Sequence, residues 1–62
     1  MTLKDARLFS GKTQEEAAAE LGVTIGAISQ WEHGLSRPRW AMVKKVAKCY
    51  GVSVEELFDD DD

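Results

Sequence analysis

The feature that most constrains the fold of this chain is residues 13–34, TQEEAAAELGVTIGAISQWEHG, which read as two short helices joined at a glycine. Thr13 and Glu16 have the Ser/Thr-x-x-Glu spacing of a capping box, in which each side chain accepts a hydrogen bond from a backbone N–H at the start of a helix. The first helix is therefore expected to begin at Gln14. Gly22 is expected to end it, because the residue after a helix often needs a positive φ, which glycine adopts without a Cβ penalty.

The second helix of this segment is expected to start after Thr24, whose hydroxyl can cap it, and to continue to about His33, with Gly34 ending it. Small and apolar residues recur at helical spacing in both helices, so each has a narrow stripe that can pack closely against a neighbour. The stripe of the first helix comprises Ala17, Ala18 and Leu21, and that of the second comprises Ile28 and Trp31. Two helices joined by a three-residue turn containing glycine have the geometry of a helix-turn-helix.

The pattern TQEE-x-A-x-x-LGV-T-x-x-x-IS-x-WE-x-G resembles the Cro/repressor-type helix-turn-helix family, also called the xenobiotic-response-element type, which is typical of bacterial and phage regulators. The resemblance extends to Leu3, Ala6 and Arg7, to the Arg-Pro pair at residues 37–38 and to YGVSVEEL at residues 50–57, so it lacks only the acidic end. It implies an all-α, compact, five-helix, repressor-like DNA-binding domain, with the helix-turn-helix at the second and third helices.

The flanking segments carry signals for three further helices. Thr2 can cap a helix from Leu3 to about Ser10, and Ser53 opens a short last helix with a second capping box. Between these, Pro38 is expected to start a helix over about residues 39–50. Helical spacing there is shown by Trp40, Val43, Val46, Ala47 and Tyr50. We expect one domain at residues 1–58, followed by a tail at residues 59–62.

The charge of the chain is distributed unevenly. The formal net charge is −3, but four of the eleven acidic residues are Asp59 to Asp62, so the remaining seven face eight Lys and Arg and leave a net charge of +1. A terminal run of acids is usually a solvated, frayed end, which is the interpretation we favour. The alternative is a tail that competes with phosphate for a basic face and weakens non-specific binding.

Several classes of protein are disfavoured by the residue content. The single Cys49 can form no intramolecular disulfide and is expected to pack in or beside the core, and one cysteine with one histidine supplies no zinc site. We expect no cofactor, metal or small-molecule ligand, and no enzyme, because no nucleophile–base pair, paired carboxylate site or phosphate-cradling glycine loop is visible. No membrane segment is visible either, and a cytoplasmic location is expected.

One charged residue falls on an inward face. Arg7 shares the inner face of the first helix with Leu3, Ala6 and Ser10, and an unpaired charge on a buried face is costly. The family resemblance implies Glu32, near the end of the third helix, as the partner in a structural ion pair.

Two sets of residues are expected to contact DNA. Gln14 opens the second helix, where backbone N–H groups and the helix dipole favour an anion, and Lys12 and Thr13 lie beside it. The resemblance implies phosphate contacts for Gln14, His33, Arg37 and Arg39. The base-reading set is expected on the exposed face of the third helix: Thr24, Ile25, Gly26, Ala27 and Gln30.

The base-reading set is short of polar side chains. Where family members usually carry long polar residues, Ile25 offers only an apolar contact, suited to a thymine methyl group, and Gly26 offers no side chain. The missing Cβ of Gly26 indicates either tolerance at this position or a close approach to the groove. Gln30 is the best candidate for a bidentate hydrogen bond to a base.

The leading hypothesis is a sequence-specific transcriptional regulator, a Cro-like repressor that binds a pseudo-palindromic site on double-stranded DNA as a homodimer. The alternative is a protein-interaction module of the same fold, such as an antitoxin, an antirepressor or a partner of a larger regulator. Candidate dimer contacts are apolar residues that a small core would not hide: Leu35, Trp40, Met42, Val54 and Phe58.

Overall fold

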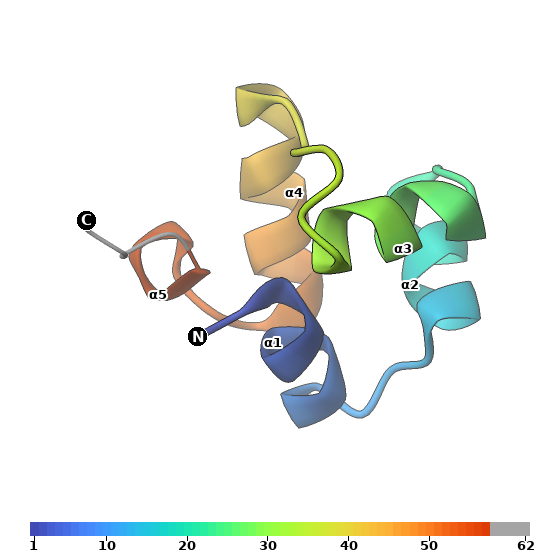
Figure 1. Ribbon diagram of the computed structural model, residues 1–62. Helices are drawn as coiled ribbons and strands as arrows, with labels where there is room; N and C mark the ends of the chain where they lie inside the picture. Colours follow the sequence, from blue (N-terminus) through green and yellow to red (C-terminus); the bar gives the residue numbers. More distant parts are fainter. Residues whose placement is uncertain (58–62) are drawn as a thin grey trace.

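Five helices follow one another along residues 1–57, the part of the chain that the computed structural model describes, and no strand occurs in that part (Figure 1). The helices are α1 (Leu3–Phe9), α2 (Gln14–Leu21), α3 (Ile25–Glu32), α4 (Trp40–Tyr50) and α5 (Val54–Leu57). The all-α, five-helix fold expected from the sequence is thereby confirmed. Phe58 and the acidic tail at residues 59–62 lie outside the described residues.

Side-chain caps set where the helices begin. The Thr13 hydroxyl accepts a hydrogen bond from the Glu16 N–H at 3.0 Å, and the Glu16 carboxylate accepts one from the Thr13 N–H at 2.8 Å. Ser53 and Glu56 exchange the same pair of bonds before α5. Thr2 caps α1 through the Asp5 N–H. These local contacts explain why the predicted starts of α1, α2 and α5 are accurate. The ends are less so, since α1 and α3 each end one residue earlier than expected.

The start of α4 differs from the expectation. Arg39 has an extended backbone, with φ −66° and ψ 158°, and stands immediately before Trp40, the first helical residue. This extended residue separates Pro38 from the helix, so Pro38 does not occupy the first turn as predicted. Pro38 is instead buried within the segment that joins α3 to α4.

The core lies where α1, α2, α3 and α4 meet. Ile28 of α3 and Val46 of α4 are its largest fully buried side chains. Ala17 and Ala18 of α2 are also buried, so α2 packs against both α3 and α4 through bare methyl groups. In Figure 1, α2 and α3 lie together on one side of the molecule, and α5 lies on the opposite side beside α4. None of the helices in residues 1–57 has the length and apolar character needed to cross a membrane.

Candidate nucleic-acid interface

The turn between α2 and α3 fixes the orientation of α3 relative to α2. Gly22 adopts the left-handed conformation with φ 72°, and the N–H of Val23 then donates to the carbonyl of Ala18 at 3.0 Å. Thr24 starts α3 by accepting a hydrogen bond from the Ala27 N–H at 3.1 Å. Because Ile28 is fully buried against the core, the opposite side of α3 is turned outward.

The outward side of α3 carries the predicted base-reading set. Thr24, Gly26 and Gln30 are exposed, Ile25 is 46% exposed, and Ala27 is half-buried. The structure therefore places all five residues at or near one surface, with the small and apolar members gathered in the first turn. Gln30 lies one turn further along the helix, and its Oε1 is 3.5 Å from the Ser36 hydroxyl.

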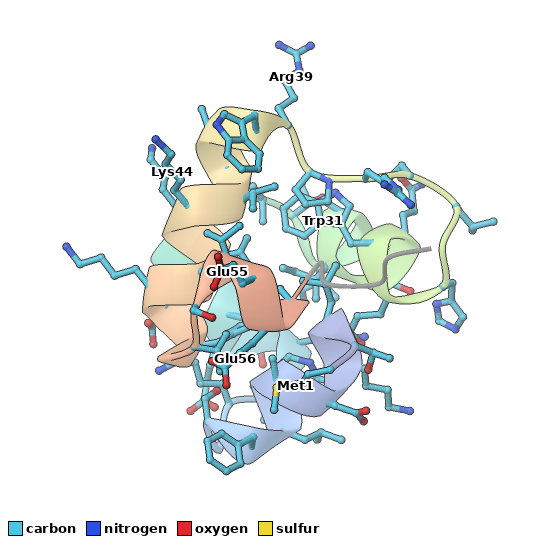
Figure 2. The ribbon with its side chains drawn as sticks, turned by 90° about the vertical axis from the view of Figure 1, so that its left-hand side faces the viewer. Met1, Trp31, Arg39, Lys44, Glu55 and Glu56 are labelled. Atoms are coloured by element: carbon cyan, nitrogen blue, oxygen red, sulfur yellow. The ribbon has the colours of Figure 1, made fainter. Side chains whose placement is uncertain are left out.

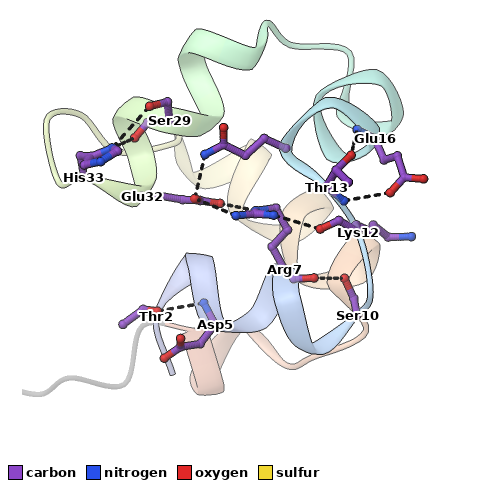
Figure 3. Close-up of polar contacts among 11 residues, drawn as sticks. Thr2, Asp5, Arg7, Ser10, Lys12, Thr13, Glu16, Ser29, Glu32 and His33 are labelled. Carbon is purple, nitrogen blue, oxygen red and sulfur yellow. Dashed lines mark hydrogen bonds and ion pairs between the residues drawn. The ribbon is translucent and has the colours of Figure 1, made fainter.

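The inner end of α3 is held by Arg7, as the family resemblance implied. Nε of Arg7 donates to Oε2 of Glu32 at 2.6 Å, and Nη2 donates to Oε1 at 3.2 Å (Figure 3). The third guanidinium nitrogen, Nη1, donates to the carbonyl oxygen of Lys12 at 3.0 Å. The side chains of Arg7 and Glu32 are only 8% and 4% exposed. This bidentate pair joins α1, the loop before α2 and the end of α3.

Gln14 belongs to the same network, which sequence reasoning did not anticipate. Its Nε2 donates to Oε1 of Glu32 at 3.0 Å, so the first residue of α2 is bonded to the last residue of α3. The second amide hydrogen of Nε2 and the amide oxygen remain for an outside ligand. No local sequence signal points to this bond, because it depends on how α2 and α3 pack in three dimensions.

The network keeps its charges at neutral pH. Burial raises the pKa of Glu32, but hydrogen bonds from Arg7 and Gln14 outweigh it, and the pKa lies below its ordinary value. The hydrogen bond to Glu32 raises the pKa of the Arg7 guanidinium. Tyr50 lies close enough to respond to the same charges: burial, followed by the negative charge of Glu32, raises its pKa to about 12. Arg7 and Glu32 therefore act as a fixed ion pair.

The predicted phosphate-contacting residues fall into two groups in the structure. Lys12, Thr13 and Gln14 surround the start of α2, where they line an open groove that continues to Ile25 of α3. Nζ of Lys12 is 3.1 Å from a carboxylate oxygen of Glu20, and this hydrogen bond raises the pKa of the lysine. The groove thus connects the start of α2 with the first residue of α3.

The second group lies at and beyond the end of α3. Nδ1 of His33 donates to the Ser29 carbonyl at 2.8 Å, which fixes the exposed imidazole ring. Arg37 and Arg39 are exposed, and neither forms an ion pair within residues 1–57. Figure 2 shows Arg39 projecting away from the body of the molecule at the start of α4. Both guanidinium groups are therefore available to an external anion.

The candidate dimer contacts differ widely in exposure. Leu35 is 77% exposed and Trp40 is 65% exposed, whereas Met42 and Val54 are partly buried against the core. Phe58 lies outside the described residues. The structure also exposes Leu8 and Phe9 of α1, which the sequence analysis did not single out.

No metal-binding constellation of three or more His, Cys, Asp or Glu side chains occurs in the part of the chain that the structure describes. Cys49 is half-buried against the core, as expected, and its thiol donates to Glu20 at 3.4 Å. Burial, followed by the hydrogen bond to Glu20, raises the pKa of this thiol, so it stays protonated at neutral pH.

The sequence is similar to those of known helix-turn-helix proteins, in agreement with the helix-turn-helix geometry of α2 and α3. The sequence profile of the helix-turn-helix family matches residues 3–57. The chain is 36% identical over 58 residues to the cryptic phage CTXphi transcriptional repressor RstR of Vibrio cholerae, covering 94% of this chain and 52% of that protein. It is 33% identical over 60 residues to the transcriptional activator BcrR of Enterococcus faecalis, covering 97% of this chain and 29% of that protein.

A third relative has nearly the same length as this chain. An uncharacterized helix-turn-helix transcriptional regulator of Methanocaldococcus jannaschii is 37% identical over 62 residues, covering 97% of this chain and 94% of that protein. The chain thus spans less than a third of BcrR and about half of RstR, but almost all of the archaeal regulator. No solved structure matches the chain significantly. The family match over residues 3–57, together with the capped α2-turn-α3 unit, shows that the chain belongs to the Cro/repressor-type helix-turn-helix family.

Proposed function

We propose that this chain regulates transcription by binding a specific sequence of double-stranded DNA, with the first turn of α3 in the major groove. The observation that carries the proposal is the contrast within α3: its inner end is fixed by the Arg7–Glu32 pair, while Ile25 and Gly26 in its first turn are exposed. A rigidly held helix with an open first turn suits insertion into a groove. The proposed activity is binding of DNA without catalysis. We propose the cytoplasm as the place where the protein acts, since its ligand is DNA.

Phosphate contacts would position the protein on the duplex. The start of α2 presents unpaired backbone N–H groups and the remaining amide hydrogen of Gln14, and the loop after α3 presents Arg37 and Arg39. These two groups flank the base-reading surface along the chain, as expected for contacts to the backbone on either side of a groove. Such contacts orient the protein but carry no sequence information directly.

Base recognition would rest on few side chains. Ile25 and Ala27 supply apolar contacts to thymine methyl groups, and Gln30 supplies the one long polar side chain of the set. One helix in one groove reads few base pairs, so we propose that two copies bind successive major grooves about 34 Å apart on a pseudo-palindrome. The exposed Leu35 and Trp40 support a contact between the two copies.

The test is selection of bound sites from a random DNA library, followed by affinity measurement on the enriched duplex over a range of salt concentrations. We expect enrichment of a symmetric site, and affinity that falls steeply with salt, with a slope of about −0.9 for each phosphate neutralised. Sedimentation of the protein with and without the duplex measures the number of copies bound. Enrichment of no sequence, with flat salt dependence of the residual binding, would contradict the proposal.

A second candidate function is a protein-interaction module. It is favoured by exposed apolar residues, among them Leu8, Phe9 and Ile25, and by the net charge of −3. Such a module would bind duplex DNA weakly or not at all, and its partner binding would survive high salt because apolar contacts release no counterions. The salt series on the selected duplex therefore distinguishes the two functions.

A further inference from the structure

Gly26 has no structural reason within the described chain to be a glycine. Its φ is not positive, unlike that of the glycines at Gly11, Gly22, Gly34 and Gly51. A Cβ built at Gly26 would have one neighbour within 4 Å, the Thr24 hydroxyl oxygen at 3.8 Å, which is an ordinary van der Waals contact. An alanine methyl group therefore fits at this position, as far as the fold is concerned.

Gly26 does not serve as a hinge either. The hydroxyl of Thr24 accepts from the Ala27 N–H at 3.1 Å, and the Thr24 carbonyl accepts from the Ile28 N–H at 3.3 Å. Both bonds span Gly26 and close the turn around it. A glycine in a closed helical turn lowers the stability of the folded state relative to alanine, because it loses more backbone freedom on folding. The fold gains nothing in return.

The position of Gly26 indicates what the missing side chain serves. It lies between Ile25, which is 46% exposed, and the half-buried Ala27, and it shares a helix face with the exposed Gln30 four residues later. These neighbours are the residues to which we assign base contacts. A methyl group at position 26 would stand at the centre of that surface and separate the helix backbone from whatever the surface meets.

We propose that Gly26 determines specificity by the depth of contact: the missing Cβ lets the first turn of α3 seat against the base edges, so that Ile25 and Ala27 reach thymine methyl groups. This inference rests on the proposed function, since it requires duplex DNA as the ligand. It assigns a recognition role to a residue without a side chain. Recognition of thymine methyl groups then depends on the absence of an atom in the protein.

The probe for the test is the duplex enriched from a random library by the wild-type protein. Gly26→Ala is expected to raise the midpoint of thermal unfolding by about 3 °C, because alanine replaces a helical glycine. The same variant is expected to bind the duplex about tenfold more weakly, the effect of losing one base-edge contact or more. A variant that is more stable and yet binds less tightly cannot be explained by unfolding.

A second measurement isolates the methyl contacts. Replacing a thymine of the enriched half-site by deoxyuridine removes one methyl group, and at a contacted position this is expected to weaken wild-type binding about fourfold. The Gly26→Ala variant is expected to bind the thymine and deoxyuridine duplexes equally, since its helix stands further from the bases. The matched control is Ala19→Gly on the exposed side of α2, which should lower the unfolding midpoint and leave affinity unchanged.

The outcomes separate the two proposals. Enrichment of a duplex that Gly26→Ala binds as tightly as wild type would overturn the role of Gly26 and leave the proposed function standing. The role of Gly26 would also be overturned if deoxyuridine weakened binding by the Gly26→Ala variant as much as binding by the wild type. Failure of the wild-type protein to enrich any duplex would overturn both proposals.

Discussion

The two ends of α3 are built in opposite ways. At the inner end, the side chain of Glu32 is 4% exposed and receives hydrogen bonds from Arg7 of α1 and Gln14 of α2. At the outer end, the first turn has a single side-chain cap from Thr24 and presents an isoleucine and a glycine to the surroundings. The difference teaches that separate residues set the orientation of the helix and the surface it offers. Variants at the inner end should therefore change stability, and variants at the outer face should change recognition.

The largest expected effect is at the inner end. Arg7→Ala leaves the Glu32 carboxylate buried with Gln14 as its remaining side-chain donor, and removal of one partner from a buried pair typically costs about 3 kcal/mol or more of unfolding free energy. Urea unfolding measures this loss. Lys12→Ala is the control, because it breaks the exposed pair with Glu20 instead and should change the stability much less. Equal losses in both variants would show that the inner end is not specially fixed.

Protonation of Glu32 at acid pH should also lower the unfolding free energy. The loss should be smaller than in Arg7→Ala, since protonation leaves both side chains in place. The pKa of Glu32 in the folded state lies below its ordinary value of 4.5, so the stabilisation is complete above that value and is lost as pH falls through the folded pKa. Urea unfolding between about pH 5 and pH 3 measures the loss. Glu32→Gln, which cannot titrate, should flatten this part of the curve. An unchanged curve in that variant would assign the acid sensitivity to other carboxylates.

On the outer face the expected change is in recognition. Gln30→Ala should relax base preference at one position of the selected site by about 1–3 kcal/mol and leave the unfolding free energy nearly unaltered. Arg37→Ala should instead weaken all sequences alike and reduce the salt slope by about 1. Repeating the site selection and the salt series with each variant distinguishes these effects. The reverse pattern would refute the division between base-reading and phosphate-contacting residues.

The smallest expected effect concerns Thr24, the cap at the outer end of α3, where one residue contributes to stability as well as to the exposed surface. Thr24→Ala removes the hydroxyl that accepts from the Ala27 N–H and should lower the unfolding free energy by about 1 kcal/mol. Thr24→Ser keeps an acceptor oxygen and should retain most of the stability. Thermal unfolding of the two variants under the same conditions measures the difference. Identical midpoints would show that the first turn of α3 does not depend on its cap.

Much of the fold was predictable because its helix boundaries are encoded locally. Thr2, Thr13, Thr24 and Ser53 each cap a helix within three residues of themselves, so their effect is visible in the sequence. Pro38 was misplaced because the conformation of the following Arg39, rather than the proline, decides where α4 begins.

The candidate site was predictable in its membership but not in its internal contacts. The exposure of Ile25 and Gln30 follows from helical periodicity once Ile28 is known to face the core. The bond from Gln14 to Glu32 joins residues 18 positions apart, and its formation depends on the angle at which α2 and α3 pack. The Lys12 pair with Glu20 likewise requires the loop before α2 to fold back beside the helix.

The two tryptophans lie in different environments, so their intrinsic fluorescence can report on two regions of the protein. Trp31 (Figure 2) packs partly buried against the core, whereas Trp40 is 65% exposed beside Arg37 and Pro38. In a Trp40→Phe variant the remaining indole emission reports the integrity of the core. In a Trp31→Phe variant it reports events at the arginine-bearing loop. Fluorescence of two unlabelled single-tryptophan variants can therefore follow unfolding and ligand contact as separate signals.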